Sequence, residues 1–266
     1  MDNFSTYIFR EEYEKYKHLG DSLSNISDSI DWERFREIIS PLYKDNKKDG
    51  GRPHLDEIVM IKTLILQHLY GLSDYEIERN IYDRMSFRHF SGFPDTIPDR
   101  LTIWLFRERL IKSDSLDLIW KELQNQIDKM GFGIQRGVIQ DATFITTDPG
   151  HAKKDKPRGD EALTRRPKEG TWSKIGNNSY FGFKIHPLVD KEHILIREVR
   201  TSTASLHDSQ IDLSAPGQTI YRDKGYFGVK PNASMDKTMH RASRNHPLSC
   251  KEKRRNKLTS FASFSD

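Results

Sequence analysis

Apolar residues in the first half of the chain recur every three or four positions, which is the spacing of one helix face. The strongest segment covers 55–70; it is apolar on most sides and stops at Gly71, so it predicts a buried helix. Ser73-Asp74-Tyr75-Glu76 has the residues of a capping box and predicts the start of the next helix. Further helices are expected over 7–17, from Asp31 to Leu42, from Pro98 to Leu110, and from Asp114 or Ser115 to Met130.

The helix, glycine turn and helix over 55–83 have two interpretations. The arrangement is compatible with a helix-turn-helix that enters a DNA groove. It is equally compatible with a plain helical hairpin, because an apolar first helix suits the core of a bundle. The sequence leaves both open.

The second half of the chain has β-like patterns after Gly131-Phe132-Gly133. The segment 137–145 is rich in Val, Ile, Thr and Phe and predicts a strand with Asp141 at its middle. A second β-like run, 218–223, ends on Asp223. A buried carboxylate is costly unless it is paired, so two strands that each carry one suggest a divalent-metal site. For either aspartate alone, capping of a neighbouring turn is the simpler explanation.

A β-hairpin is predicted over 180–189 and 194–200, on either side of the polar turn Asp190-Lys191-Glu192. One face of its first strand would carry the apolar residues Phe181, Phe183, Ile185 and Val189. The opposite face carries Lys184 and His186. A single histidine in a strand usually has a structural role, and contact with a substrate is the alternative.

Composition limits the class of protein. Charged residues make up 31% of the 266 residues, and no apolar run approaches the roughly 20 residues that a membrane span needs. No secretory signal precedes the first helix, and Cys250 is the single cysteine, so neither disulfides nor a cysteine-built zinc site are expected. These features together predict a soluble, cytoplasmic protein without membrane partners.

Charge is distributed unevenly along the chain. Residues 1–136 carry four more acidic than basic residues, whereas 137–266 carry eight more basic than acidic ones. The basic residues are concentrated in an insertion at 148–178, which has almost no apolar residues and contains Trp172 near its C-terminal end. Clustered Lys and Arg favour a polyanion, and Trp172 could stack on a base. A solvated loop anchored by Trp172 is the alternative.

The order of elements in the second half is strand with Asp, hairpin, short helical stretch from Leu206-His207-Asp208 to Leu213, and strand with Asp. This is the order of an RNase H-like fold, in which neighbouring strands bring two carboxylates together. The expected fold class is therefore α+β, with a helical domain at 1–130 and an RNase H-like α/β catalytic domain at 131–266.

Several ordered motifs carry a resemblance to a known family. Gly51-Arg52-Pro53 precedes the long apolar helix, Asp141-Ala142-Thr143 forms the first acidic motif, and Tyr180-Phe181-Gly182-Phe183-Lys184-Ile185-His186 forms a Gly-aromatic-Lys-x-His strand. Asp223-Lys224-Gly225-Tyr226 follows as the second acidic motif. In these motifs the chain resembles the DDE transposases of prokaryotic insertion sequences, in the insertion-sequence-5-like branch of the IS4-like superfamily.

The resemblance implies a mechanism and partners. Asp141 and Asp223 would be catalytic and would bind two Mg²⁺ or Mn²⁺ ions, of which one activates the attacking water or 3′-hydroxyl and the other stabilises the leaving oxygen. The partner would be double-stranded DNA, both the terminal inverted repeats of the element and the target, and the helical domain would bind the DNA ends or form a homodimer. The residues expected to contact DNA are Lys153, Lys154, Arg165, Arg166, Trp172, Lys184, His186, Lys224, Tyr226, Arg244, Arg254 and Arg255.

One departure from the family pattern concerns the third acid. The family places a Glu on a later helix, whereas here no Glu follows Glu252, which lies too early in the motif to replace it. We therefore expect the catalytic domain to be truncated before its third acid, to lack the final helix, and to have little or no activity. Two further readings stay open: a DNA-binding remnant that inhibits transposition without catalysis, and an RNase H-like nuclease that needs no third Glu.

Overall fold

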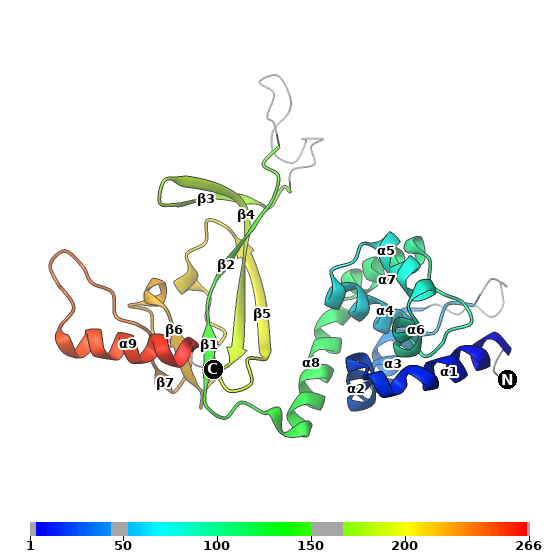
Figure 1. Ribbon diagram of the computed structural model, residues 1–266. Helices are drawn as coiled ribbons and strands as arrows, with labels where there is room; N and C mark the ends of the chain where they lie inside the picture. Colours follow the sequence, from blue (N-terminus) through cyan, green and yellow to red (C-terminus); the bar gives the residue numbers. More distant parts are fainter. Residues whose placement is uncertain (1–3, 44–52, 151–166, 265–266) are drawn as a thin grey trace, which may run out of the picture. The chain divides into compact units, whose positions relative to one another are not determined.

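The computed structural model describes residues 4–43, 53–150 and 167–264 of the chain. The chain divides into two compact units, Met1–Gly131 and Phe132–Asp266 (Figure 1). The first unit is helical and the second is built on a mixed sheet, so the expected α+β class with an RNase H-like second part is confirmed.

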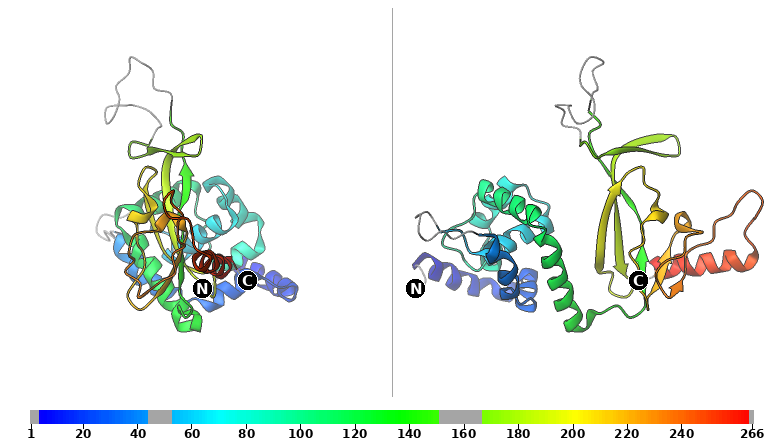
Figure 2. Two further views of the ribbon diagram at one scale, coloured as in Figure 1. Left: turned by 90° about the vertical axis from the view of Figure 1, so that its left-hand side faces the viewer. Right: turned by 180° about the vertical axis from the view of Figure 1, so that it is seen from behind.

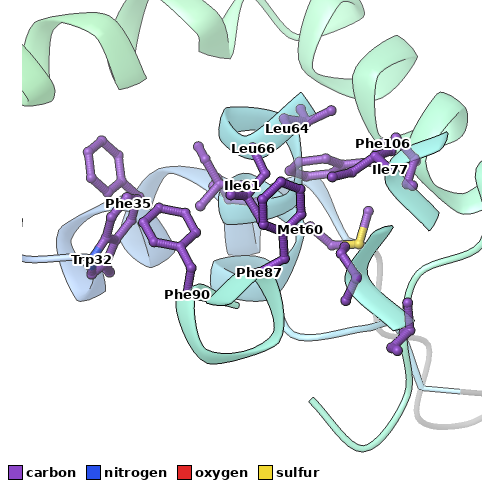
Figure 3. Packing of buried hydrophobic residues seen from close by; sticks show 14 of the residues in the cluster. Trp32, Phe35, Met60, Ile61, Leu64, Leu66, Ile77, Phe87, Phe90 and Phe106 are labelled. Atoms are coloured by element: carbon purple, nitrogen blue, oxygen red, sulfur yellow. The ribbon is translucent and has the colours of Figure 1, made fainter. Parts of the chain in front are cut away.

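The first unit consists of short helices around one apolar core. Its elements are α1 (Phe4–Tyr16), η1 (Lys17–Leu19), α2 (Ser22–Ser29), α3 (Glu33–Ile39), η2 (Ser40–Leu42), α4 (Glu57–Tyr70), α5 (Asp74–Asp83), α6 (Met85–Phe90), α7 (Arg100–Lys112) and α8 (Ser115–Ile127). Figure 3 shows Met60, Ile61 and Leu66 of α4 packed among Phe87 of α6 and neighbouring aromatic side chains. The core is therefore organised around α4.

The strongest helix signals of the sequence are confirmed. Asp56 accepts hydrogen bonds from the first turn of α4, and Gly71 ends that helix in the left-handed conformation. Ser73 and Glu76 form both hydrogen bonds of the capping box that begins α5. The helix expected from Asp31 instead has Trp32 at its N-cap position. Two short helices, α2 and α6, were not predicted, because each is too short to show a helical period.

The position of α4 and α5 bears on the two interpretations of 55–83. Helix α4 lies in the core, with eight buried residues, which suits a bundle. The exposed residues of α5 include Glu76 and Asp83 beside Arg79. A recognition helix would meet the DNA phosphates with basic residues, so these acids favour the plain helical hairpin.

The second unit is a mixed sheet followed by one helix. Its elements are η3 (Asp128–Phe132) at the junction, β1 (Val138–Gln140), β2 (Thr143–Thr146), β3 (Thr171–Ile175), β4 (Asn178–Asp190), β5 (Ile196–Thr203), η5 (Asp208–Gln210), β6 (Thr219–Arg222), η6 (Lys224–Tyr226), β7 (Met235–Asp236) and α9 (Cys250–Phe264). The path through the sheet is β2-β4-β1-β6-β7, with β3 and β5 also paired to β4. The predicted hairpin corresponds to β4 and β5 and is confirmed.

Strand β4 connects most of the sheet. It pairs antiparallel with β1 and β2 along one edge and with β5 along the other. Strand β1 pairs in parallel with β6, with Gln140 opposite Arg222. A small core lies against these strands and consists of Val138, Leu188, Leu213, Ile220 and Ala233.

One strand prediction needs correction. The segment 137–145 is two strands rather than one, because the chain breaks at Asp141 between β1 and β2. For β4 the sequence had identified two faces but not the buried one: Lys184 and His186 are buried, whereas Phe183 and Ile185 are only half-buried. The buried polar residues have hydrogen-bond partners inside the unit, and this removes the cost that the sequence pattern implied.

The expectation that the final helix is absent is wrong. Helix α9 is present, and Ser249 and Glu252 form a capping box at its start. Arg255 donates a hydrogen bond to the backbone carbonyl of Asp236, and Asn256 pairs with the backbone of His240. Figures 1 and 2 show α9 beside the segment of β6 and β7. The sequence signal for this helix was the pair Ser249 and Glu252.

No helix among the described residues is both long and apolar enough to cross a membrane.

The close approach of β1 and β6 gives a first prediction. A Cβ added at Gly137, where φ is +102°, would lie 2.5 Å from the carbonyl oxygen of Thr219, whereas a Cβ at Gly217, where φ is +90°, would meet nothing within 4 Å. Both Gly137→Ala and Gly217→Ala should lower the free energy of unfolding by about 1 kcal/mol, because alanine is strained in the left-handed backbone conformation. Gly137→Ala should lose about 1–3 kcal/mol more, because β1 must move away from β6. Hydrogen exchange of the β1 and β6 amides measures the difference; equal exchange in the two variants would contradict it.

A second prediction concerns pH and the first unit. The Glu57 side chain is 7% exposed and accepts hydrogen bonds from Arg36, Ser40 and His54. Burial acts to raise the pKa of Glu57, but hydrogen bonds from Ser40 and His54 and the charge of Arg36 outweigh it and lower that pKa. The ionised group therefore stabilises the fold above its unfolded pKa of about 4.3, and this contribution is lost as the pH falls through the lower folded pKa.

Glu57→Gln should accordingly lower the melting temperature at pH 7, and its difference from the wild type should shrink below about pH 4. Glu37→Gln, at an exposed position of α3, is the matched control and should melt like the wild type at both pH values. Thermal unfolding followed by circular dichroism measures this. A difference between Glu57→Gln and the wild type that stays constant down to pH 2 would refute the assignment.

Candidate functional site

Asp141 and Asp223 occupy equivalent positions on neighbouring parallel strands. Gln140 and Arg222 are paired in the register of β1 and β6, and each aspartate is the next residue of its chain. Neighbouring strands lie about 4.8 Å apart, so the two carboxylates leave the same end of the sheet side by side. Asp141 accepts a hydrogen bond from the amide of Ala142, and Asp223 accepts one from the amide of Gly225. These contacts hold both side chains at the strand ends.

The charges of the two aspartates act on each other. Desolvation raises the pKa of Asp141, and the carboxylates of Asp223 and Asp208 raise it further. Carboxylates that repel one another in this way are stabilised by a cation. The structure thus brings Asp141 and Asp223 together and adds Asp208, for which the sequence had indicated only a helical turn.

Lys184 and His186 lie on the buried face of β4. Lys184 is 6% exposed and its ammonium donates hydrogen bonds to the backbone of Leu206 and to the carboxylate of Asp208, both at 2.7 Å. His186 is fully buried and pairs with the hydroxyl of Ser202 at 2.8 Å. The sequence had suggested that both side chains contact DNA. Because both are buried, neither reaches the surface to do so. Both instead support the strand that lies beside the two aspartates.

Tyr226 and Arg222 form the floor of the second acidic motif. Tyr226 is 1% exposed, so the expected contact with DNA is not available to it either. Arg222 is 2% exposed; it donates to the hydroxyl of Thr238 and the carbonyl of Val229, and its guanidinium lies over the Tyr226 ring. These contacts fix the turn that follows Asp223.

The remaining predicted contacts with DNA are at the surface or outside the described residues. Lys224, Arg244, Arg254 and Arg255 are exposed. Trp172 is 51% exposed on β3, where its ring lies beside that of Phe181. Four further candidates lie outside the described residues: Lys153, Lys154, Arg165 and Arg166.

Glu252 does not join the two aspartates. Its carboxylate accepts hydrogen bonds from Ser249 and lies 3.2 Å from the ring of His240. It belongs to the first turn of α9, and in Figure 1 that turn is at the end of the helix farther from β1. Glu252 is therefore a capping residue, in agreement with the sequence argument that it lies too early to act as the third acid.

The pair of aspartates fits a divalent cation. Mg²⁺ is typically bound by one or two carboxylates, with waters and substrate phosphates completing its shell. Asp141 and Asp223 supply such a pair of oxygen ligands, and the buried hydroxyl of Tyr226 has no hydrogen-bond partner in the part of the chain that the structure describes. Within that same part, no three His, Cys, Asp or Glu side chains are close enough as placed to hold one ion together. A cation at this edge of the sheet would therefore be held by the carboxylate pair alone, with other ligands from water or substrate.

Comparison with known protein families gives two matches. Residues 11–109 match a family model described as transposase domain DUF772, and residues 133–264 match one described as transposase DDE domain. No solved structure matches the chain significantly. The two family models follow one another along the chain, and the second includes both aspartates and α9. The chain belongs to the DDE transposases.

Proposed function

We propose that this chain is a transposase of an insertion sequence in the insertion-sequence-5-like branch, whose reaction is cleavage and transfer of DNA strands at the ends of its element, and that the missing third acid leaves its activity low or absent. The observation that supports the proposal most strongly is the parallel register of β1 and β6. It pairs Gln140 with Arg222, so Asp141 and Asp223 follow at the same end of the two strands. In-line displacement at phosphorus is promoted mainly by positioning and by charge stabilisation, and two adjacent carboxylates are suited to both tasks through bound cations.

DDE transposases generally use divalent metal ions and act on DNA. For this chain we assign two Mg²⁺ or Mn²⁺ ions to Asp141 and Asp223; when bound, such ions activate the attacking oxygen and stabilise the leaving one. The backbone amides of Ala142 and Gly225 orient the two carboxylates. The buried Arg222 holds the turn after Asp223 through Thr238 and Val229. These supporting contacts keep the carboxylates preorganised.

We assign DNA binding to the exposed basic residues of the second unit and to Trp172. The helical first unit is proposed to bind the terminal inverted repeats or to form a homodimer. Its exposed surface includes aromatic side chains on α5 and α7, Tyr75, Tyr82 and Trp104. Aromatic residues of this kind are enriched at interfaces.

A third prediction separates catalysis from binding. Asp141→Asn and Asp223→Asn preserve side-chain size but remove the negative charge, so each should lower Mg²⁺-dependent cleavage by at least about a hundredfold. DNA binding should be retained. The substrate is a duplex that carries the genomic sequence flanking the coding region, and the readouts are strand cleavage and strand transfer by the full chain. Asp212→Asn, a half-buried carboxylate of the same unit, is the control.

Each outcome of this assay identifies one function. Cleavage and joining at the element ends, lost in both variants, supports transposition. Cutting at unrelated positions with the same dependence on Asp141 and Asp223 indicates an RNase H-like nuclease. Salt-dependent binding without cutting by any of these proteins indicates a DNA-binding remnant that inhibits transposition. The wild-type rate in this assay also measures the impairment that was expected from the missing third glutamate.

A fourth prediction concerns DNA affinity. Arg244 and Arg254 are exposed basic residues of the second unit. If both contact phosphates, the double variant Arg244→Ala/Arg254→Ala should bind DNA more weakly, and the slope of log affinity against log salt should fall by about 2. The control Lys15→Ala/Lys112→Ala removes two exposed lysines that lie beside Glu12 and Glu108. Fluorescence anisotropy over a salt series measures both slopes. An unchanged slope in the arginine variant would contradict the assignment.

A further inference from the structure

Asp208 lies beside the two strand-end aspartates although it comes from a different segment. It begins η5, the short helical turn after β5, and η5 lies against η6, the turn that follows Asp223. The Lys184 ammonium contacts its Oδ1 at 2.7 Å. Because Lys184 is buried on the central strand β4, this ion pair holds Asp208 at a defined position.

The charge of Asp208 acts on several groups of the site. Besides desolvation and the charge of Asp223, it raises the pKa of Asp141. Burial raises the pKa of the Tyr226 hydroxyl, and Asp208 is the next cause, ahead of Asp141. Since η5 lies against η6, Asp208 is near the second acidic motif, and its charge acts on groups of both motifs.

A second observation points to a ligand among these carboxylates. Tyr226 is 1% exposed, and its hydroxyl makes no hydrogen bond of good geometry among the described residues. The Gln140 side chain acts to lower the pKa of this hydroxyl, whereas the charges of Asp208, Asp141 and Asp223 raise it. Tyr226 ends η6, which lies against the turn that carries Asp208. A buried hydroxyl without a partner is costly, and a ligand with its bound waters would satisfy it.

We propose that Asp208, held by Lys184, is a third carboxylate beside the metal centre, where it does not bind the ion directly but its negative charge strengthens the binding of a divalent cation at Asp141 and Asp223. The inference rests on the proposed function, since it concerns the same cation site. It assigns the third carboxylate to the turn after β5, and not to α9, where the family pattern places a glutamate.

The ion pair with Lys184 allows an alternative that the experiment must separate. Asp208 could act only by neutralising Lys184, whose positive charge would otherwise repel a cation. In that case the negative charge of Asp208 would have no effect once Lys184 is also removed. If Asp208 contributes its own charge to the centre, its loss weakens cation binding with or without Lys184.

The fifth prediction is tested by Mn²⁺ binding to the full chain, followed by electron paramagnetic resonance of the free ion, which needs neither DNA nor turnover. Asp208→Asn keeps a hydrogen-bond acceptor for Lys184 and should weaken Mn²⁺ binding about tenfold or more. Asp212→Asn, which removes a half-buried carboxylate that accepts hydrogen bonds from Ser214 and Asn232, should bind Mn²⁺ like the wild type. Glu252→Gln should do the same.

The pair of variants Lys184→Met and Lys184→Met/Asp208→Asn completes the cycle. Lys184→Met should bind Mn²⁺ at least as tightly as the wild type, and the added Asp208→Asn should again weaken binding about tenfold. The double variant leaves no unpaired buried cation, so it carries the test even where Asp208→Asn alone fails to fold.

The outcomes distinguish this inference from the proposed function. Mn²⁺ binding that is unchanged in Asp208→Asn, or weakened only while Lys184 is present, overturns the inference. Equal weakening in Asp212→Asn reduces it to a general charge effect and also overturns it. Asp141→Asn and Asp223→Asn, measured in parallel, test the site itself: loss of binding in these two with no change in Asp208→Asn leaves the proposed function intact and rejects only the role of Asp208.

Discussion

The parallel pairing of β1 with β6 is the constraint on which the rest of the second unit depends. Two carboxylates that leave neighbouring strands in the same direction repel one another, and the pKa of Asp141 is raised although both side chains are exposed at the surface. The fold accepts this cost because the strands are fixed elsewhere. Strand β1 is also paired to β4, and Val138 and Ile220 pack in the small core beneath. The backbone position of each aspartate is thus set by strand pairing, and the amides of Ala142 and Gly225 orient the carboxylates.

The polarity of β4 follows from the same requirement. A strand in a two-layer fold usually turns its apolar residues inward, but here Lys184, His186 and Asp190 are buried. Lys184 is paired with Asp208, His186 with Ser202, and Asp190 with His193. These positions of β4 thus bury polar rather than apolar side chains. Their hydrogen bonds fix the strand beside the two aspartates. Removal of one partner would leave a buried polar group unpaired, which is costly.

Local signals in the sequence predicted the elements that they control directly. Asp56, Gly71 and the Ser73–Glu76 box act within a few residues of their own helices, so α4 and the start of α5 were predicted well. The two aspartates were recognised because a carboxylate in the middle of a β-like run, as predicted for Asp141, or at its end, as for Asp223, is unusual. The Ser249–Glu252 box was equally local and would have indicated α9. In that case a resemblance to the family pattern outweighed a signal in the residues themselves.

Other features depend on contacts between distant segments and could not be read from local pattern. Whether Lys184 faces the core is decided by Asp208, 24 residues later, and the role of Asp208 depends on the turn that follows β6. Alternation along β4 identified two faces but not which one is buried. The break of the first strand at Asp141 likewise follows from its neighbours, since β1 pairs with β4 and β6 whereas β2 pairs with β4.

Cation binding by the aspartate pair can be measured directly by anomalous diffraction from crystals of the full chain grown or soaked in Mn²⁺. If Asp141 and Asp223 bind the ion, an anomalous peak appears at the ends of β1 and β6, with a carboxylate oxygen of each aspartate about 2.1–2.2 Å from a metal position. Strong Mn²⁺ peaks elsewhere in the chain, with none at this pair of strand ends, would contradict this assignment.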